Sequence, residues 1–283
     1  MSGKCYRSEL IGLFGCPVDE NATVAIMEAA FKELGLNYRY NTTLVYPKDL
    51  ETAVKALKAF NMKGTHITIP HKVEVLQYLD HLSETAALMG AVNTIYLKDG
   101  ETYGENTDGK GFITSLAEAG VEFKGKKTVL LGAGGAARAM SVELAAAGVS
   151  DILVVNRGEE RGKALADLLN GKTASNAEYV SWAGTFRVPD DTDIVVNATS
   201  IGMHPDSNKP DIDYSSLLDS MIVCDGVHNP VQTPFLKEAA KRGCRTLDGF
   251  SMLINQGAIS FKLWTGLDAP VDVMKKALER ELN

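Results

Sequence analysis

The chain has 283 residues, of which 45% are hydrophobic and 23% charged, and its formal net charge is −7 at pH 7. This composition provides a large core for one or two domains, and without a basic stripe the acidic chain is not expected to bind nucleic acid. Because no run of residues is apolar enough to span a membrane and no secretory signal opens the sequence, we expect a cytoplasmic protein with no membrane partner.

Strand-like and helix-like segments alternate through the first part of the chain. Apolar spacing predicts, in chain order, a strand over 9–15, a helix over 24–36, a strand over 38–45, a helix over 49–62 and a strand over 65–70. Residues 92–106 read as a hairpin with its turn at Lys98, Asp99 and Gly100. This order favours a mostly parallel sheet with an antiparallel edge, and therefore the α/β class.

A second series of strands and helices begins near residue 126. Strands are predicted over 126–132, 151–157, 193–199 and 221–227, a weaker strand over 179–182, and helices over 252–266 and 271–281. No low-complexity linker separates the two series. We therefore place the domain boundary within ordered structure near Thr107.

Cysteine and histidine usage indicates neither disulfides nor a metal centre. Cys5, Cys16, Cys224 and Cys244 are scattered, which predicts free thiols in a reducing compartment. His66 lies in a predicted strand and His71 beside Pro70, so both are interpreted as packing or hydrogen-bonding residues.

A glycine-rich turn joins the predicted strand at 126–132 to the helix that follows. In the segment VLLGAGGAARA, Gly132, Gly134 and Ala137 fit the pattern G-x-G-x-x-G/A. The first glycine permits the tight turn, the second lets a diphosphate approach the backbone, and the small third residue lets helix and strand pack closely. The pattern in this context predicts a dinucleotide-binding domain.

The end of the next strand bears on the choice of nucleotide. An acidic residue there would bind the ribose 2′-hydroxyl of NAD, but this chain has Asn156 and Arg157, with Arg161 one helical turn later. A guanidinium group suits a 2′-phosphate, so NADP is favoured and NAD stays possible. The alternative is a solvated basic turn paired with Glu159 and Glu160.

Two further residues are candidates for proton transfer. Lys72 follows a strand and a proline, where it could face a cleft, although a solvated lysine is the simpler reading. Asp108 sits in a polar turn after the hairpin, where a helix N-cap is the simpler reading.

Eight segments in one order resemble the shikimate/quinate dehydrogenase family over nearly the whole chain. They are THITIPHK, GAVNTIY, NTDGKGF, GAGGAARA, NR with a downstream arginine, NATSIGM, NPVQTP and DGFSMLINQGAISFKLWTG. The resemblance implies a substrate-binding catalytic domain over 1–107 and 250–283, an NADP-binding Rossmann domain over 108–249, and an active site in the cleft between them.

The resemblance also implies a reaction and its residues. Hydride would pass reversibly between NADP and ring C3 of shikimate, and the match assigns Lys72 and Asp108 as a catalytic acid/base pair. Thr68, Asn93 and Gln256 would bind ring hydroxyls. The residues implied in NADP binding are Gly132, Gly134, Gly135, Ala136, Asn156, Arg157, Arg161, Thr199 and Met203, with Val227 and Gly249 near the nicotinamide.

Three positions on the substrate side depart from the family pattern. Where the family has Ser-x-Ser or Ser-x-Thr for the substrate carboxylate, this chain has Asn21, Ala22 and Thr23, preceded by Asp19 and Glu20. Glu105 and His228 each replace a tyrosine. We expect Asn21, Thr23 and His228 to contact the substrate, and these changes make its identity the open question.

Several alternatives therefore stay open. The expected partner is a small anionic cyclic polyol acid, and the chain would act as a monomer or homodimer. A relative acting on quinate, aminoshikimate or another cyclic polyol acid is the first alternative to shikimate dehydrogenase. A non-enzymatic NADP(H)-binding sensor is the alternative of a different class, but it would not need both Lys72 and Asp108.

Overall fold

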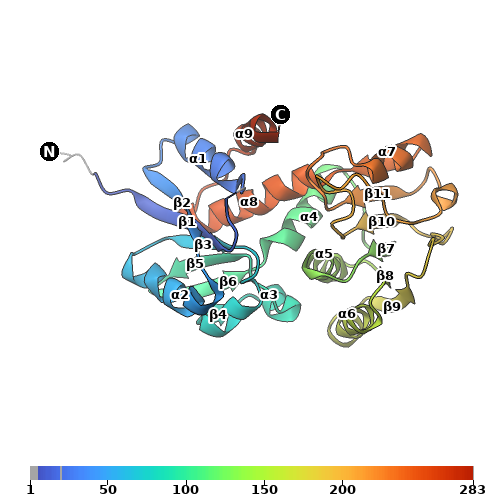
Figure 1. The fold of residues 1–283 in the computed structure, drawn as a ribbon, viewed down its shortest axis with the longest axis horizontal. Helices are drawn as coiled ribbons and strands as arrows, with labels where there is room; N and C mark the ends of the chain where they lie inside the picture. Colours follow the sequence, from blue (N-terminus) through green and yellow to red (C-terminus); the bar gives the residue numbers. More distant parts are fainter. Residues whose placement is uncertain (1–5, 20, 283) are drawn as a thin grey trace. The chain divides into compact units, whose positions relative to one another are not determined.

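The computed structural model describes residues 6–19 and 21–282, so Cys5 and Glu20 lie outside the described residues. The chain divides into two compact units, the first formed by Met1–Thr107 with Ile254–Asn283 and the second by Asp108–Leu253. Each unit contains one six-stranded sheet (Figure 1).

The first unit contains β1 (Glu9–Gly15), α1 (Thr23–Glu33), β2 (Tyr38–Leu44), η1 (Pro47–Asp49), α2 (Leu50–Ala59), β3 (Gly64–Ile67), η2 (Glu74–Tyr78), β4 (His81–Leu82), α3 (Glu84–Met89), β5 (Thr94–Lys98), β6 (Glu101–Glu105) and α9 (Val271–Leu282). The second contains β7 (Lys127–Leu131), α5 (Gly135–Ala146), β8 (Asp151–Asn156), α6 (Glu159–Lys172), β9 (Asn176–Ser181), β10 (Ile194–Asn197), η3 (Tyr214–Ser216), β11 (Ile222–Asp225), α7 (Pro234–Lys241) and β12 (Arg245–Leu247). Helices α4 (Thr107–Glu118) and α8 (Gly249–Thr265) each include residues of both units.

The sheet of the first unit is mixed, as the sequence predicts. Its strand order is β2-β1-β3-β5-β6-β4, with β1 parallel to both β2 and β3. Strands β5 and β6 form the predicted antiparallel hairpin, and Asp99 and Gly100 turn the chain with φ of 54° and 82°. Asp and Gly tolerate this left-handed conformation, which a two-residue hairpin turn requires.

The C-terminal segment completes the core of this first unit. Phe261 in α8 stacks on Phe31 in α1 with ring centroids 5.6 Å apart, and Trp264 Nε1 donates to the Ile95 carbonyl at 2.8 Å. All four side chains are nearly fully buried. Helix α9 packs beside α1 (Figure 1), so residues from both ends of the chain share one core.

The second unit is a parallel sheet with the strand order β12-β11-β10-β7-β8-β9. If the six strands are renumbered from β7 as strand 1 to β12 as strand 6, the order read from β9 is 3-2-1-4-5-6, which is that of the doubly wound dinucleotide-binding fold. Helix α6 packs on β8 and β9, and α7 on β11 and β12. The predicted α/β class and the Rossmann sheet are therefore confirmed.

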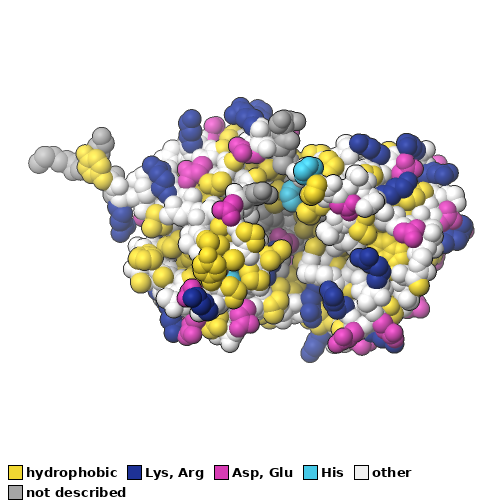
Figure 2. Space-filling view, viewed as in Figure 1, with side chains coloured by type: hydrophobic (Ala, Val, Ile, Leu, Met, Phe, Trp, Pro, Cys, Tyr) yellow, Lys and Arg dark blue, Asp and Glu magenta, His cyan; other side chains and the backbone are white. Residues whose placement is uncertain are grey.

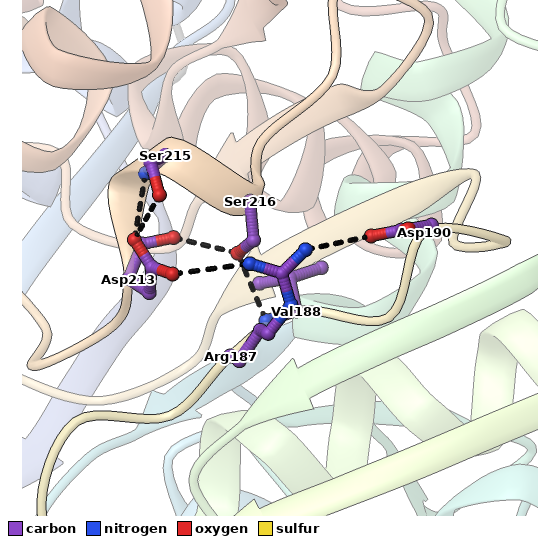
Figure 3. A network of polar contacts seen from close by, with 6 residues as sticks. All are labelled: Arg187, Val188, Asp190, Asp213, Ser215 and Ser216. Carbon is purple, nitrogen blue, oxygen red and sulfur yellow. Dashed lines mark hydrogen bonds and ion pairs between the residues drawn. The ribbon is translucent and has the colours of Figure 1, made fainter.

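A polar network fixes the connections around β10 (Figure 3). Arg187 donates to Asp213 at 3.3 Å and to Asp190 at 3.2 Å, while the Ser216 hydroxyl accepts from the Val188 nitrogen at 3.0 Å. The Ser215 hydroxyl, bonded to Asp213, is the main cause that lowers the pKa of that carboxyl. The network ties the segment before β10 to η3.

The first unit also exposes large hydrophobic side chains. Figure 2 shows hydrophobic side chains gathered on the visible face of this unit. Among its exposed large hydrophobic residues are Leu44, Tyr46, Ile69 and Val73. In the part of the chain that the structure describes, no helix has the length and apolar character needed to cross a bilayer.

Candidate active site

The turn between β7 and α5 lies close to β8 on one side and to the segment after β10 on the other. Gly132 has a φ of 109°, and its nitrogen donates to the Val155 carbonyl of β8 at 2.8 Å. A Cβ added to Gly132 would lie 2.9 Å from Thr199 Cγ2 after β10. Strands β7 and β10 are neighbours from which the chain runs in opposite directions across the sheet, and ligands of such sheets bind at this switch point.

The N-terminus of α5 presents exposed backbone beside this turn. Gly134, Gly135 and Ala136 are exposed, and a Cβ on either glycine would meet no atom within 4 Å. Gly134 is the N-cap and no side chain caps the helix, whereas Ala137 is fully buried. Uncapped N–H groups and the helix dipole suit a phosphate, so these residues fit the diphosphate of a dinucleotide.

Two arginines follow β8. Arg157 and Arg161 are both exposed, and neither forms an ion pair within the described residues. Glu159 pairs with Lys163 at 2.6 Å, so this acid is not the partner of the arginines that a solvated basic turn would need. Two guanidinium groups without carboxylate partners fit a 2′-phosphate.

A cavity of about 570 Å³ lies beside Arg157. Arg157 and Trp182 line it together with Ser200 and Ile201 from the turn after β10. The amide nitrogen of Asn156 donates to the Gly158 carbonyl at 2.8 Å and holds the turn that carries Arg157. The cavity therefore joins two segments that were expected to bind the cofactor.

Asn197 at the end of β10 organises the next turn. Its oxygen accepts from both the nitrogen and the hydroxyl of Thr199, at 3.1 and 2.7 Å, and its amide nitrogen donates to the Ile201 carbonyl at 3.2 Å. The Met203 nitrogen donates to the Ser200 carbonyl at 3.1 Å. Thr199 is thus held by its neighbours in the turn that approaches Gly132.

Asp225 at the end of β11 is buried beside Asn197. Its carboxylate accepts hydrogen bonds from the Asn197 amide at 2.9 Å, the Thr233 hydroxyl at 2.6 Å and the Val227 nitrogen at 3.0 Å. Burial outweighs these bonds and raises the pKa of Asp225 to about 6. Neither Asp225 nor Thr233 belongs to a phosphate-binding pattern, so their pairing could not be predicted from the sequence.

The raised pKa of Asp225 predicts a pH-dependent stability. Between about pH 4 and 6 the folded state binds more protons at this group than the unfolded state, so the free energy of unfolding should fall as pH rises through that window. The loss should reach about 3 kcal/mol. Chemical denaturation of the wild type and of Asp225→Asn across this range measures it, and only the wild type should show this part of the decline. Parallel curves for the two proteins would contradict the assignment.

Val227 and Gly249 come together where β11 and β12 end. A Cβ on Gly249 would lie 2.6 Å from the Val227 carbonyl, so only glycine permits this approach. The Val227 side chain is fully buried, and His228 beside it is half-buried. Burial lowers the pKa of His228, which favours the neutral imidazole at pH 7.

In the first unit, a tight turn after β3 carries Lys72. The Thr68 nitrogen donates to the Phe14 carbonyl at 3.0 Å, and the His71 nitrogen donates to the Thr68 carbonyl at 2.9 Å. The His71 ring bonds the Val45 carbonyl at 2.7 Å through Nε2. Lys72 is half-buried. His71 thus anchors the turn through a hydrogen bond, and His66 likewise bonds the Tyr40 hydroxyl at 2.6 Å.

Asn93 and Gln256 belong to one buried polar network with Thr107. The Asn93 oxygen accepts from the Thr107 nitrogen at 2.8 Å, and its amide nitrogen donates to the Thr107 hydroxyl at 3.0 Å and to Gln256 at 3.5 Å. Ser260 bonds the Thr107 hydroxyl at 3.2 Å and the Thr94 hydroxyl at 2.9 Å. Thr94, Thr107 and Ser260 were missed by the sequence analysis because buried hydroxyls follow no recognisable spacing.

This network links the backbone positions of Lys72 and Asp108. The Lys72 carbonyl accepts from the Val92 nitrogen at 2.8 Å, and the next residue, Asn93, holds the Thr107 nitrogen. Asp108 follows Thr107 directly at the start of α4. The hydrogen bonds therefore reach Lys72 and the residue that directly precedes Asp108.

A cavity of about 440 Å³ follows the carboxyl ends of β1 and β3. Pro17, Val18, Asp19, Asn21, Thr68 and Ile69 line it. The Asn21 oxygen accepts from the Thr23 nitrogen at 2.9 Å, where α1 begins. Thr23 itself does not line this cavity. Of the two residues expected to bind the substrate here, Asn21 is the one that the cavity includes.

Glu105 has a local role in the structure. Its Oε1 accepts from the Ser83 hydroxyl at 2.6 Å and from the Asn106 nitrogen at 2.9 Å. Ser83 in turn caps α3 by accepting from the Ala86 nitrogen. Glu105 thus joins the end of β6 to the start of α3. Among the described residues, no group of three His, Cys, Asp or Glu side chains could hold a metal ion.

Comparison with known families covers most of the chain. The model for the shikimate dehydrogenase substrate binding domain matches residues 13–95, the shikimate / quinate 5-dehydrogenase model residues 115–205, and the shikimate 5'-dehydrogenase C-terminal domain model residues 249–279. A shikimate dehydrogenase (NADP(+)) of Desulforamulus reducens is 40% identical, over 98% of this chain and 96% of its own length.

Two solved structures are similar throughout. The ligand-free 5-ketofructose reductase of Gluconobacter sp. strain CHM43 is 44% identical with a TM-score of 0.95, covering 98% of this chain and 99% of that one. A shikimate dehydrogenase in complex with NADP+ is 39% identical with a TM-score of 0.89, covering 98% of this chain and 96% of that one.

Proposed function

The chain belongs to the shikimate dehydrogenase family, and on that premise we propose that it is an NADP-dependent dehydrogenase whose substrate pair is shikimate and 3-dehydroshikimate. Shikimate and NADP+ would give 3-dehydroshikimate, NADPH and a proton. The switch point of the second unit, where Gly132 approaches Thr199 next to an uncapped helix N-terminus, supports the cofactor part of the proposal, and the shikimate dehydrogenase relatives support the substrate pair. The relatives do not favour the non-enzymatic sensor or the other cyclic polyol acids.

NADP, when bound, accepts or supplies the hydride. The exposed backbone of Gly134, Gly135 and Ala136 would hold its diphosphate, and Arg157 with Arg161 its 2′-phosphate. We propose Lys72 and Asp108 as the pair that orients the reacting alcohol and moves its proton. The hydrogen bonds of Val92, Asn93 and Thr107 support this pairing, because they hold Lys72 and the residue just before Asp108.

Purified enzyme tests the proposal directly. Shikimate with NADP+ should produce NADPH, and 3-dehydroshikimate should consume it. NAD+ should give a lower kcat/KM, because the end of β8 provides Asn156 and Arg157 where an NAD-binding strand has an acid for the ribose 2′-hydroxyl. The proposed cofactor preference fails if NAD+ and NADP+ serve equally.

Arg157→Ala should weaken NADP binding selectively. Loss of a guanidinium bonded to a phosphate should raise the KM for NADP about 10- to 100-fold and leave the KM for NAD nearly unchanged. Arg242→Ala, which removes an exposed arginine at the end of α7, is the matched control. An equal rise in KM for both nucleotides would show that Arg157 has a structural role and does not bind the 2′-phosphate.

The relative from Gluconobacter favours a second candidate substrate class. Its name gives it an uncharged keto sugar as substrate, and it resembles this chain over 98% of the length at 44% identity. Reduction of a keto group by NADPH uses the same hydride and proton transfers. The second candidate function is therefore an NADPH-dependent reductase of a polyhydroxy ketone.

A further inference from the structure

The cavity of about 440 Å³ after β1 and β3 has lining residues that bear on the charge of a bound substrate. It lies at the carboxyl ends of two parallel neighbouring strands, where sheets of this kind bind ligands. Thr68 in its wall is four residues before Lys72, in the turn that His71 closes. The cavity is therefore part of the same local structure as the proposed catalytic lysine.

The polar lining includes an anion. Asp19 lines the cavity, and among the described lining residues none is a lysine, arginine or histidine. The other polar groups are the Asn21 amide and the Thr68 hydroxyl. A substrate carboxylate placed here would meet the Asp19 charge and no positive side chain to offset it.

Part of the donor capacity at the start of α1 is already used. The Thr23 nitrogen, one of the first donors of the helix, already donates to Asn21 at 2.9 Å. The Ala25 nitrogen donates to the Ala22 carbonyl at 3.1 Å. The NH2 group of Asn21 is the part of the amide that can donate to a ligand.

This donor and acceptor set suits hydroxyl groups. A hydroxyl can donate to the Asp19 carboxylate and accept from the Asn21 NH2 group, and the Thr68 hydroxyl can do either. A carboxylate can only accept, so it satisfies Asn21 but not Asp19. The other lining residues, Pro17, Val18 and Ile69, have apolar side chains that provide no further polar group.

We propose that Asp19, Asn21 and Thr68 select a hydroxyl-bearing, uncharged end of the substrate, so that the enzyme reduces uncharged polyhydroxy ketones in preference to a carboxylated ring. In this reaction the ketone carbon gains the hydride that NADPH gives up, and the ketone oxygen gains a proton. The products are a secondary alcohol and NADP+. The inference rests on the second candidate function proposed above, and it concerns the substrate of the same NADP-dependent site.

The test compares two ketones as substrates of the full-length enzyme with NADPH. They are 5-ketofructose, which is uncharged, and 3-dehydroshikimate, which carries the carboxylate. We expect kcat/KM for 5-ketofructose to be at least tenfold higher. In the reverse direction with NADP+, the methyl ester of shikimate should be oxidised better than shikimate, because the two differ at the carboxylate alone.

Asp19→Asn supplies the residue-level test. It removes the charge and should raise kcat/KM for 3-dehydroshikimate about tenfold, mainly through KM, with an unchanged KM for NADPH. Asp49→Asn is the matched control, since it removes an exposed charge of the same unit outside the cavity. It should leave kcat/KM unchanged for both ketones.

The outcomes separate the two proposals. A preference of the wild type for 3-dehydroshikimate, unchanged in Asp19→Asn, would overturn the inference and leave the proposed function standing. Turnover of neither ketone nor shikimate by an enzyme that still binds NADPH would overturn the proposed function, and the inference with it. A preference for the uncharged ketone that Asp19→Asn reduces would support the inference and the second candidate function, and 3-dehydroshikimate would then not be the preferred substrate.

Discussion

Lys72→Ala should lower kcat about 10²- to 10⁴-fold, because it removes the group proposed to move the proton of the reacting hydroxyl. NADPH binding should be unchanged, since the residues proposed to bind the cofactor belong to the second unit. Lys72→Arg should be nearly as impaired, because a guanidinium keeps its proton at every accessible pH. Stopped-flow or steady-state rates, with NADPH binding measured by fluorescence, check both results.

Lys98→Ala is the control for this loss. Lys98 is exposed at the end of β5, and its removal should leave kcat within about twofold of the wild type, as surface substitutions normally have small effects. Asp108→Asn and the double variant extend the test. If the two residues act as a pair, the double variant should be little slower than the worse single variant. The proposed pair would be refuted if the kcat loss of the double variant equalled the product of the two single losses, or if Lys72→Ala were fully active.

Asp225→Ala should destabilise the second unit by about 2–4 kcal/mol, because three buried donors lose their acceptor. The Thr233 hydroxyl and the Asn197 amide would stay buried without this partner. Since Asn197 also holds the Thr199 turn, the KM for NADP should rise as well. Chemical denaturation and cofactor titration measure the two effects.

Asp219→Ala separates this effect from a general loss of charge. Asp219 is exposed between η3 and β11, so its removal should change the free energy of unfolding by less than about 0.5 kcal/mol. Thr233→Val removes one donor of the same network, and its loss of unfolding free energy should lie between those of Asp225→Ala and Asp219→Ala. Equal stabilities for the Asp225 and Asp219 variants would show that the buried network contributes little.

The elements that carry strong periodicity could be predicted from the sequence. Strand β1 matches the predicted 9–15 to the residue, and α9 differs from 271–281 by one residue at its end. The hairpin turn was predictable because Asp99 and Gly100 tolerate positive φ. Other ends moved inwards, as for the helix predicted over 49–62, which ends at Ala59 because the segment after it turns through Asn61 at a φ of 52°.

Short and polar elements were harder to predict. Helix α7 has eight residues, and β12 has three, too few for a clear period. Helix α6 is rich in charge, although its buried residues Gly162, Leu165, Ala166 and Leu169 do follow helical spacing. Helix α6 could therefore have been predicted from its sequence. Strand β12 could not, because it is defined by its pairing with β11.

The candidate site divides in the same way. The phosphate turn was predictable because a backbone constraint at Gly132 leaves a fixed spacing of small residues. The hydrogen bonds of Glu105 with Ser83, and of Thr107 with Ser260, join residues distant in sequence, so only the folded chain reveals them. The charge of Asp19 was visible in the sequence, but its place in a cavity wall with Thr68 was not.

The division of the first unit between both ends of the chain has a consequence for synthesis on the ribosome. Residues 108–253 are continuous, so the second unit can fold as soon as it emerges. The first unit cannot, because Phe31 and Ile95 must wait for Phe261 and Trp264, which are translated after the whole second unit. The first unit should therefore be the last part of the enzyme to fold, and it should depend more on chaperones than the second unit does.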